Sequence, residues 1–162
     1  MQHPIQMKLR KGAAIALTTL MTLAAGDALA ARCLEDPIPS GWLERQEQAG
    51  GRTIKYHVAL TDTDLTEFLS TNTNWAFASS FPDPRTAEAV VGAAVLPEAK
   101  RLNDWARTAN LGDGAELRME FEQPIGRYVA RNDNATDAFG VRVVLEADGK
   151  GGCKLLFAHP TQ

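Results

Sequence analysis

A change in hydrophobic periodicity at Gly114 divides this chain into two kinds of structure. Before Gly114, apolar residues recur at spacings of three and four, which is the pattern of amphipathic helices. After it, apolar and polar residues alternate over short segments, which is the pattern of half-buried strands. Helices followed by consecutive antiparallel strands predict an α+β domain.

The individual elements follow from these periodicities and from the turn residues between them. We expect helices over 42–48, 52–58, 61–72, 85–96 and 98–109, with a loop over 74–84. We expect strands over 115–122, 124–131, 139–147 and 153–159, with hairpin turns at 132–137 and 148–152. The sequence therefore predicts amino-terminal helices packed on an antiparallel sheet of about four strands.

The first 30 residues have the order of a secretory signal peptide. Lys8, Arg10 and Lys11 precede an apolar run, and Ala28 to Ala30 form a small-x-small cleavage site. The run is too short for a comfortable membrane span; an uncleaved anchor is the alternative. We expect a single mature domain over residues 31–162, either periplasmic or secreted.

The mature part of the chain is net acidic. Residues 31–162 hold 14 of the 17 basic and 19 of the 20 acidic residues. This balance is not that of a general nucleic-acid binder. Any site for a polyanion must therefore be a local basic cleft.

Both cysteines, Cys33 and Cys153, belong to the mature part. Export permits a disulfide, and an even count of cysteines suits one. The bond would tie the amino-terminal segment to the last strand; two free buried thiols are the alternative. Because the sequence has no C-x-x-C motif or His/Cys cluster, we expect no structural zinc site.

Residues 31–162 contain two histidines, one near each end. On the last strand, alternation places Leu155, Phe157 and His159 on one face. A helix that carries His57 could cover that face. Arg142 projects opposite to its neighbours on the preceding strand, which makes it a candidate cation for the same cleft.

A series of motifs spans almost the whole mature domain: GGRTIKYHV, ASSFPDPRTAE, RLNDWA, QPIGRYVAR, GVRVVLEADGKGG and LLFAHPT. In order and spacing, this series resembles the bacterial ribonuclease A-like toxin domains found in contact-dependent and other polymorphic toxins. The resemblance implies a kidney-shaped α+β fold with a curved sheet, and cleavage of RNA without a metal ion or cofactor.

Carried over by position, the resemblance places the family's catalytic histidine at His57. Four other polar positions depart from the family pattern. Arg52 stands where the family has the first histidine of its motif, and Phe68 where it often has an arginine. Phe157 and His159 stand where the family has a threonine and a tyrosine.

The chemistry can still be completed with the residues present. RNA cleavage by transphosphorylation needs a base for the 2′-hydroxyl, an acid for the leaving 5′-oxygen and a cation beside the phosphorus. His57 and His159 would supply the base and the acid, because the pKa of histidine lies near neutrality. Arg142, Lys55 or Arg52 would supply the charge. The product would be a 2′,3′-cyclic phosphate.

Each of these residues also has a purely structural interpretation. His57 could cap or pack a helix, His159 could be an exposed surface residue and Arg142 half of an ion pair. Lys55 and Arg52 could be solvated side chains. Phe157 could stack an RNA base or lie in the core.

The sequence therefore favours an exported, monomeric endoribonuclease with RNA as substrate and a cognate inhibitor protein as a partner. An antibacterial toxin is the biological role that this reading suggests. No membrane partner is expected. The alternative is a catalytically degenerate, secreted RNase A-like binding protein, which Phe68 and Phe157 favour.

Overall fold

The computed structural model describes residues 32–162, so the expected signal peptide lies outside the described residues. In chain order, the elements are α1 Trp42–Gln48, α2 Thr53–His57, α3 Asp62–Thr71, β1 Phe77–Ser80, α4 Pro84–Val95, the 3-10 turn η1 Leu96–Glu98, α5 Ala99–Ala106, β2 Gly114–Glu120, β3 Gly126–Ala130, β4 Ala135–Ala138, β5 Gly140–Ala147 and β6 Cys153–Thr161. The predicted α+β class is confirmed.

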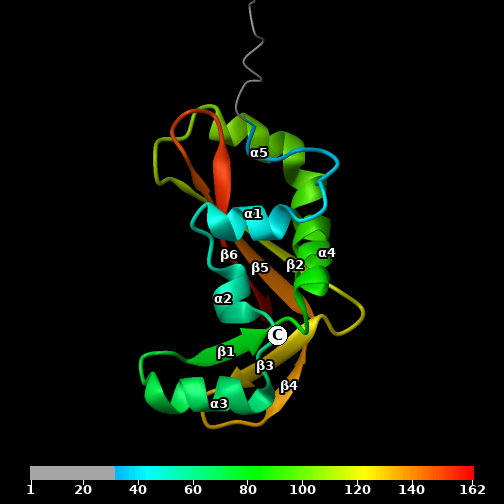
Figure 1. Ribbon diagram of the computed structural model, residues 1–162, viewed down its shortest axis with the longest axis vertical. Helices are drawn as coiled ribbons and strands as arrows, with labels where there is room; N and C mark the ends of the chain where they lie inside the picture. The colour runs from blue at the N-terminus through cyan, green and yellow to red at the C-terminus, as the bar shows by residue number, and fades with distance from the viewer. Residues whose placement is uncertain (1–31) are drawn as a thin grey trace, which may run out of the picture.

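The strands form two antiparallel three-stranded sheets, with orders β2–β5–β6 and β1–β3–β4 (Figure 1). The sequence prediction of about four strands missed β1 and β4. β1 lies in the expected loop 74–84, and β4 begins inside the expected turn 132–137. Each has four residues and pairs with β3, so neither carries an alternating pattern long enough to reveal it.

The helices α3 and α4 begin close to the predicted positions because their capping residues are strong. Thr61 forms a capping box with Asp64 at the start of α3. Asp83 caps α4 by accepting a hydrogen bond from the Thr86 amide. Pro97 lies in the 3-10 turn η1, which separates α4 from α5.

The molecule has two halves that meet near the carboxyl terminus (Figure 1). In one half, α1 and α4 cover the β2–β5–β6 sheet, and its core includes Leu43, Val91, Leu102, Val143 and Leu155. In the other half, α3 packs on β1 and β3 through Leu65, Leu69, Ala78 and Val129. The helix α2 lies where the two halves join.

A bulge in β6 changes which side chains share a face. Val144 of β5 pairs with Phe157, whereas the next residue, Leu145, pairs with Leu155, so Leu156 has no partner in the ladder. Leu155 therefore faces the core, on the opposite side from Phe157 and His159. The expectation that all three share one face is wrong for Leu155, because an interrupted ladder resets the alternation.

The predicted disulfide between Cys33 and Cys153 is confirmed, and it ties the segment before α1 to the start of β6. It closes a loop with a sequence separation of 120 residues. Over residues 32–162, no helix combines the length and the apolar character that crossing a membrane requires.

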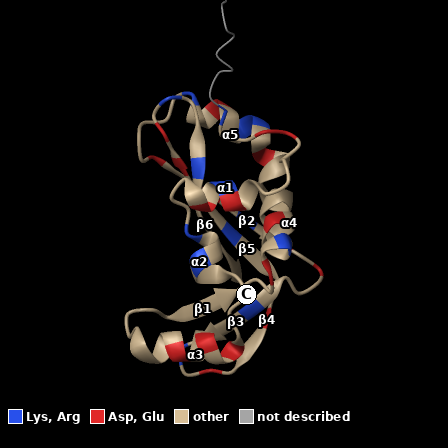
Figure 2. Cartoon of the chain, in the orientation of Figure 1, with Lys and Arg blue, Asp and Glu red and all other residues tan. Residues whose placement is uncertain are grey.

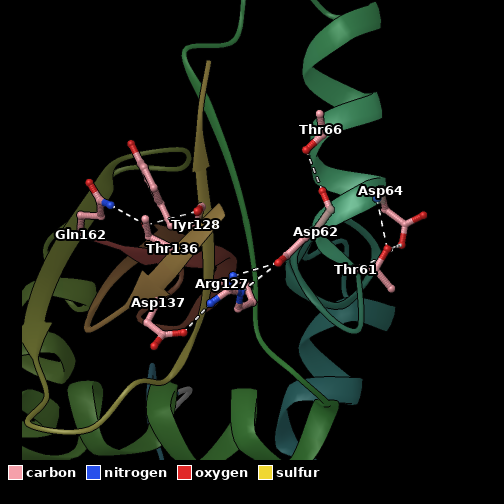
Figure 3. A network of polar contacts seen from close by, with 9 residues as sticks. All are labelled: Thr61, Asp62, Asp64, Thr66, Arg127, Tyr128, Thr136, Asp137 and Gln162. Atoms are coloured by element: carbon pink, nitrogen blue, oxygen red, sulfur yellow. Dashed lines mark hydrogen bonds and ion pairs between the residues drawn. The ribbon is translucent and has the colours of Figure 1, made fainter. Parts of the chain in front are cut away.

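An ion-pair network fixes α3 to the β1–β3–β4 sheet. Arg127 of β3 donates from Nε and Nη2 to the two carboxylate oxygens of Asp62 on α3, at 2.9 and 2.8 Å, and also pairs with Asp137 of β4 (Figure 3). In the same region, Gln162 Nε2 donates to Thr136 Oγ1 at 2.6 Å. The last residue of the chain is thereby held against β4.

Candidate active site

The amino-terminal end of α2 is fixed to the bulge in β6. The Arg52 amide donates to the Leu156 carbonyl at 2.9 Å, and the Ala158 amide donates to Thr53 Oγ1, also at 2.9 Å. Gly51 permits this close approach, because a Cβ there would lie 2.8 Å from the carbonyl oxygens of Gln46 and Leu155. Gly51 therefore has a packing role.

His57 is the last residue of α2, and β1 determines its orientation. Its carbonyl accepts a hydrogen bond from the Phe81 amide at 2.8 Å. Its ring Nδ1 lies 3.1 Å from the Ser79 carbonyl oxygen, so Nδ1 carries the proton in the neutral ring. The free lone pair of the neutral ring is then on Nε2.

His159 lies on β6 with only 4% of its surface exposed. Its Nδ1 is 3.0 Å from the Pro160 carbonyl oxygen, so its neutral ring also has the lone pair on Nε2. The centroids of the His57 and His159 rings are 5.3 Å apart, with a tilt of 37° between the ring planes. The structure thus brings together the two histidines that the sequence placed near opposite ends of the domain.

Burial lowers the pKa of both imidazoles below the ordinary value for histidine. Burial lowers the pKa of His57 to about 4, although its hydrogen bond to the Ser79 carbonyl opposes the change. Burial also lowers the pKa of His159, and the positive charges of Arg142 and Arg118 add to the effect. The hydrogen bond to the Pro160 carbonyl and the Glu116 carboxylate act in the opposite direction on His159.

A row of cationic side chains leads across the sheet to His159. Arg118 on β2 pairs in register with Arg142 on β5, and Arg142 pairs with His159 on β6. Glu116 joins the two guanidinium groups, at 2.6 Å from Arg142 Nη2 and 2.9 Å from Arg118 Nε. The hydrogen bond from Arg142 is the main reason why the pKa of Glu116 falls to about 2. The carboxylate is therefore ionised whenever the histidines titrate.

A cleft of about 250 Å³ opens beside this row. Arg118, Arg142 and His159 form one part of its wall, and the remaining lining residues are Phe77, Tyr128, Thr161 and Gln162. The cleft, called the His159 cleft below, therefore has a cationic end and an aromatic end. Outside the cleft, acidic residues recur on α1 and α3, and a basic segment occurs on α2 (Figure 2).

The other predicted site residues lie at the edge of this arrangement. Phe157 stacks near His159 at 6.0 Å between centroids, and the Arg142 guanidinium lies 5.5 Å from the Phe157 ring centroid. Lys55 Nζ lies 4.9 Å from the centroid of the exposed Tyr56 ring. Arg52 is exposed at the start of α2. Lys55, Arg52 and Phe157 do not line the His159 cleft, and His57 contacts His159 from outside that lining.

Sequence reasoning missed Arg118, Glu116 and Tyr128. Glu116 and Arg118 occupy the polar positions of an alternating strand, which typically face solvent. Their proximity to His159 depends on the register of three strands, for which the sequence carries no local signal. Tyr128 reaches the cleft because β3 pairs with β1, a strand that the sequence analysis interpreted as a loop.

Comparisons with known proteins agree on one family. Residues 51–160 match the model of the family described as bacterial CdiA-CT RNAse A domain. Among solved structures, a chain in the crystal structure of a CdiA-CT/CdiI complex from Y. kristensenii 33638 has a TM-score of 0.59 and 29% sequence identity. The match covers 65% of this chain and 95% of that chain. No curated protein matches the sequence.

Proposed function

Because this chain belongs to the bacterial CdiA-CT RNase A domain family, we propose that it is an endoribonuclease that cleaves RNA by transphosphorylation without a metal ion. The observation that carries the proposal is the pair of imidazoles, His57 and His159, with ring centroids 5.3 Å apart. Each ring has Nδ1 at a backbone carbonyl, so each leaves Nε2 for chemistry.

In the proposed reaction, His57 is the base. Its lowered pKa, about 4, keeps Nε2 unprotonated and able to accept the 2′-hydroxyl proton. The 2′-oxygen forms a bond to phosphorus as the bond from phosphorus to the 5′-oxygen breaks. His159, protonated on Nε2, gives its proton to that leaving oxygen. One product ends in a 2′,3′-cyclic phosphate, and the other carries a free 5′-hydroxyl.

Arg142 stabilises the negative charge that grows on the phosphoryl oxygens during this step. It lies directly across the strand pair from His159 and lines the same cleft. An ordered guanidinium beside developing charge is worth more in a partly buried site than in water. A bound phosphate also raises the pKa of both histidines, because its negative charge favours the imidazolium form.

The biological setting is part of the same proposal. We propose a monomeric toxin domain over residues 31–162, released from a signal peptide over residues 1–30. The disulfide is consistent with a location outside the reducing cytoplasm. The solved relative forms a complex with CdiI, which supports a dedicated inhibitor protein as the partner of this chain.

One observation favours a second candidate, a degenerate binding protein. Phe157 stacks beside His159 at a position where the toxin domains carry a threonine. This substitution removes a hydroxyl from the neighbourhood of the reacting phosphate. A protein of this kind would keep the cleft and bind RNA without cutting it.

Incubation with fluorescent RNA in EDTA distinguishes the two candidates. The endoribonuclease produces fragments that end in a 2′,3′-cyclic phosphate, detected by mass spectrometry, and the chelator does not slow their appearance. Intact RNA at every protein concentration would reject the endoribonuclease and leave the binding protein. Cleavage that EDTA abolishes would reject the proposed metal-independent mechanism.

A further inference from the structure

We propose that Glu47 of α1 is a positioning residue for His57, because its carboxylate caps the short helix α2 that ends at this histidine. The inference rests on the proposed ribonuclease function, in which His57 is the base. It adds a residue from outside the family domain, since Glu47 lies before residues 51–160, the stretch that matches the family model. The proposal therefore gives α1 a part in the chemistry of the site.

The helix α2 depends on other elements for its conformation. It has five residues, Thr53–His57. A helix this short is not stable on its own in water, because nucleation costs more free energy than so few hydrogen bonds contribute. The first four amides of a helix have no partner inside it, and the N-cap residue of α2, Arg52, makes no side-chain cap hydrogen bond. The orientation of His57 therefore depends on groups outside α2.

The Glu47 carboxylate accepts hydrogen bonds from two of these four amides. The Ile54 amide donates to Oε2 and the Lys55 amide to Oε1, both at 3.0 Å. A third amide, that of Arg52, donates to the Leu156 carbonyl. A carboxylate at the amino terminus of a helix also interacts favourably with the helix dipole. Glu47 thus caps α2 in place of a side chain from α2 itself.

The helix α1 is fixed to the rest of the domain, so the Glu47 carboxylate is held in a defined place. Glu88 of α4 accepts hydrogen bonds from two backbone amides at the start of α1, at 3.1 and 2.9 Å. Further along α1, Gln46 Oε1 accepts a hydrogen bond from the Leu155 amide of β6 at 2.7 Å. Two adjacent residues of α1 therefore bind the strand of His159 and the helix of His57 (Figure 1).

Loss of the cap is expected to reach His57, which is two residues from Lys55. Burial is the main reason why the pKa of His57 is low. If the first turn of α2 unwinds, the imidazole spends part of the time in water, and its pKa rises towards the ordinary value of 6.5. Removal of the negative charge of Glu47 acts in the opposite direction, because a nearby negative charge favours the imidazolium form. A rise in the pKa of His57 therefore reports displacement of the ring and not the lost charge.

The test follows His57 by NMR titration of its imidazole in the absence of RNA. Glu47→Ala removes both acceptor oxygens, and Glu47→Gln keeps one carbonyl oxygen. Glu44→Ala is the matched control, because it removes the carboxylate of an exposed residue on the same helix. Circular dichroism shows whether each variant is folded. The kcat and KM for RNA cleavage are then measured for the same proteins.

We expect the pKa of His57 to rise by about 0.4 to 1.5 in Glu47→Ala, the range that corresponds to the loss of one helix cap. Glu47→Gln is expected to lie between Glu47→Ala and the wild type, and Glu44→Ala to match the wild type. In Glu47→Ala, we expect kcat to fall by up to about 100-fold with KM nearly unchanged, because a misplaced base affects the chemical step rather than substrate binding.

Three results would overturn the inference: an unchanged or lowered pKa of His57 in either folded Glu47 variant, an equal rise in Glu44→Ala, or a raised pKa with an unchanged kcat. The titration needs no RNA, so it is independent of the proposed activity. If the pKa of His57 rises as expected but the wild type cleaves no RNA, the positioning of His57 by Glu47 stands and the ribonuclease function fails.

Discussion

The Arg52 amide donates a hydrogen bond to the carbonyl of Leu156, the residue at which β6 bulges. The Ala158 amide also donates a hydrogen bond to Thr53 Oγ1. Together, these two hydrogen bonds fix α2 to the strand that carries His159. Because His57 is the last residue of α2, a backbone irregularity in β6 sets the separation of the two imidazoles. The geometry of the candidate site therefore depends on a close approach between two backbones.

Gly51→Ala tests that close approach. A Cβ at Gly51 would lie 2.8 Å from two carbonyl oxygens, so α2 must shift away from β6. We expect a loss of at least about 1 kcal/mol in unfolding free energy and reduced RNA cleavage. Gly92→Ala in α4 is the matched control. Its Cβ would meet only Ile38 at 3.8 Å, and alanine gains about 0.5–1 kcal/mol in a helix. Equal stability of the two variants in urea would contradict this account.

The pH dependence of kcat/KM follows from the lowered pKa values. His57 must be unprotonated to act as the base, so activity falls as the pH drops towards its pKa of about 4. His159 must be protonated to act as the acid, and its pKa is below the ordinary value of 6.5. The kcat/KM profile, which reports the free enzyme, is thus expected to peak between the pKa of His57 and the lowered pKa of His159, and to fall towards neutrality. A maximum on the alkaline side of neutrality would contradict the assigned roles.

Glu116→Gln tests the electrostatic link across the sheet. The Glu116 carboxylate raises the pKa of His159, and it pairs with the two arginines that lower it. Removal of its negative charge is therefore expected to lower the pKa of His159 further, as measured by NMR titration of the imidazole. Glu146→Gln, which loses only a pair with Lys154 elsewhere on the sheet, is the control. An unchanged or raised His159 pKa in Glu116→Gln would refute the link.

The disulfide is expected to act on stability rather than on chemistry. Replacement of Cys33 and Cys153 by serine removes a crosslink between residues 120 apart in sequence, at a cost of about 2–5 kcal/mol. The histidine pair is held by α2, β1 and β6 through hydrogen bonds that involve neither cysteine. We expect a lower unfolding temperature and unchanged cleavage while the variant stays folded. An unaltered unfolding temperature would argue against this role.

Local sequence patterns predicted much of this fold but only part of the site. The helices, the long strands β2, β5 and β6 and the approach of His57 to His159 follow from periodicity and from the family resemblance. The short strands β1 and β4 could not be predicted in this way. They are defined by their hydrogen bonds to β3, and neither has a local alternating pattern of its own. The sequence also carries no local signal for the bulge at Leu156. Because of this bulge, Leu155 lies on the opposite face of β6 from Phe157 and His159.

The residues missed in the site share one physical cause. Arg118 and Glu116 join the site through the register of β2 with β5, and Tyr128 joins it through the pairing of β3 with β1. Cross-strand register depends on the whole sheet, so alternation alone places such residues on a face but not beside a partner.

The central claim is that His57 and His159 act on a single phosphodiester. The most direct measurement compares the cleavage rate of fluorescent RNA in EDTA for the wild type, His57→Ala, His159→Ala and the double variant, with circular dichroism to confirm folding. We predict that each single variant loses about 100-fold or more, and that the double variant loses little beyond the larger single loss, because the two groups act as one unit. Near-normal cleavage by either single variant, or losses that multiply in the double variant, would contradict the claim.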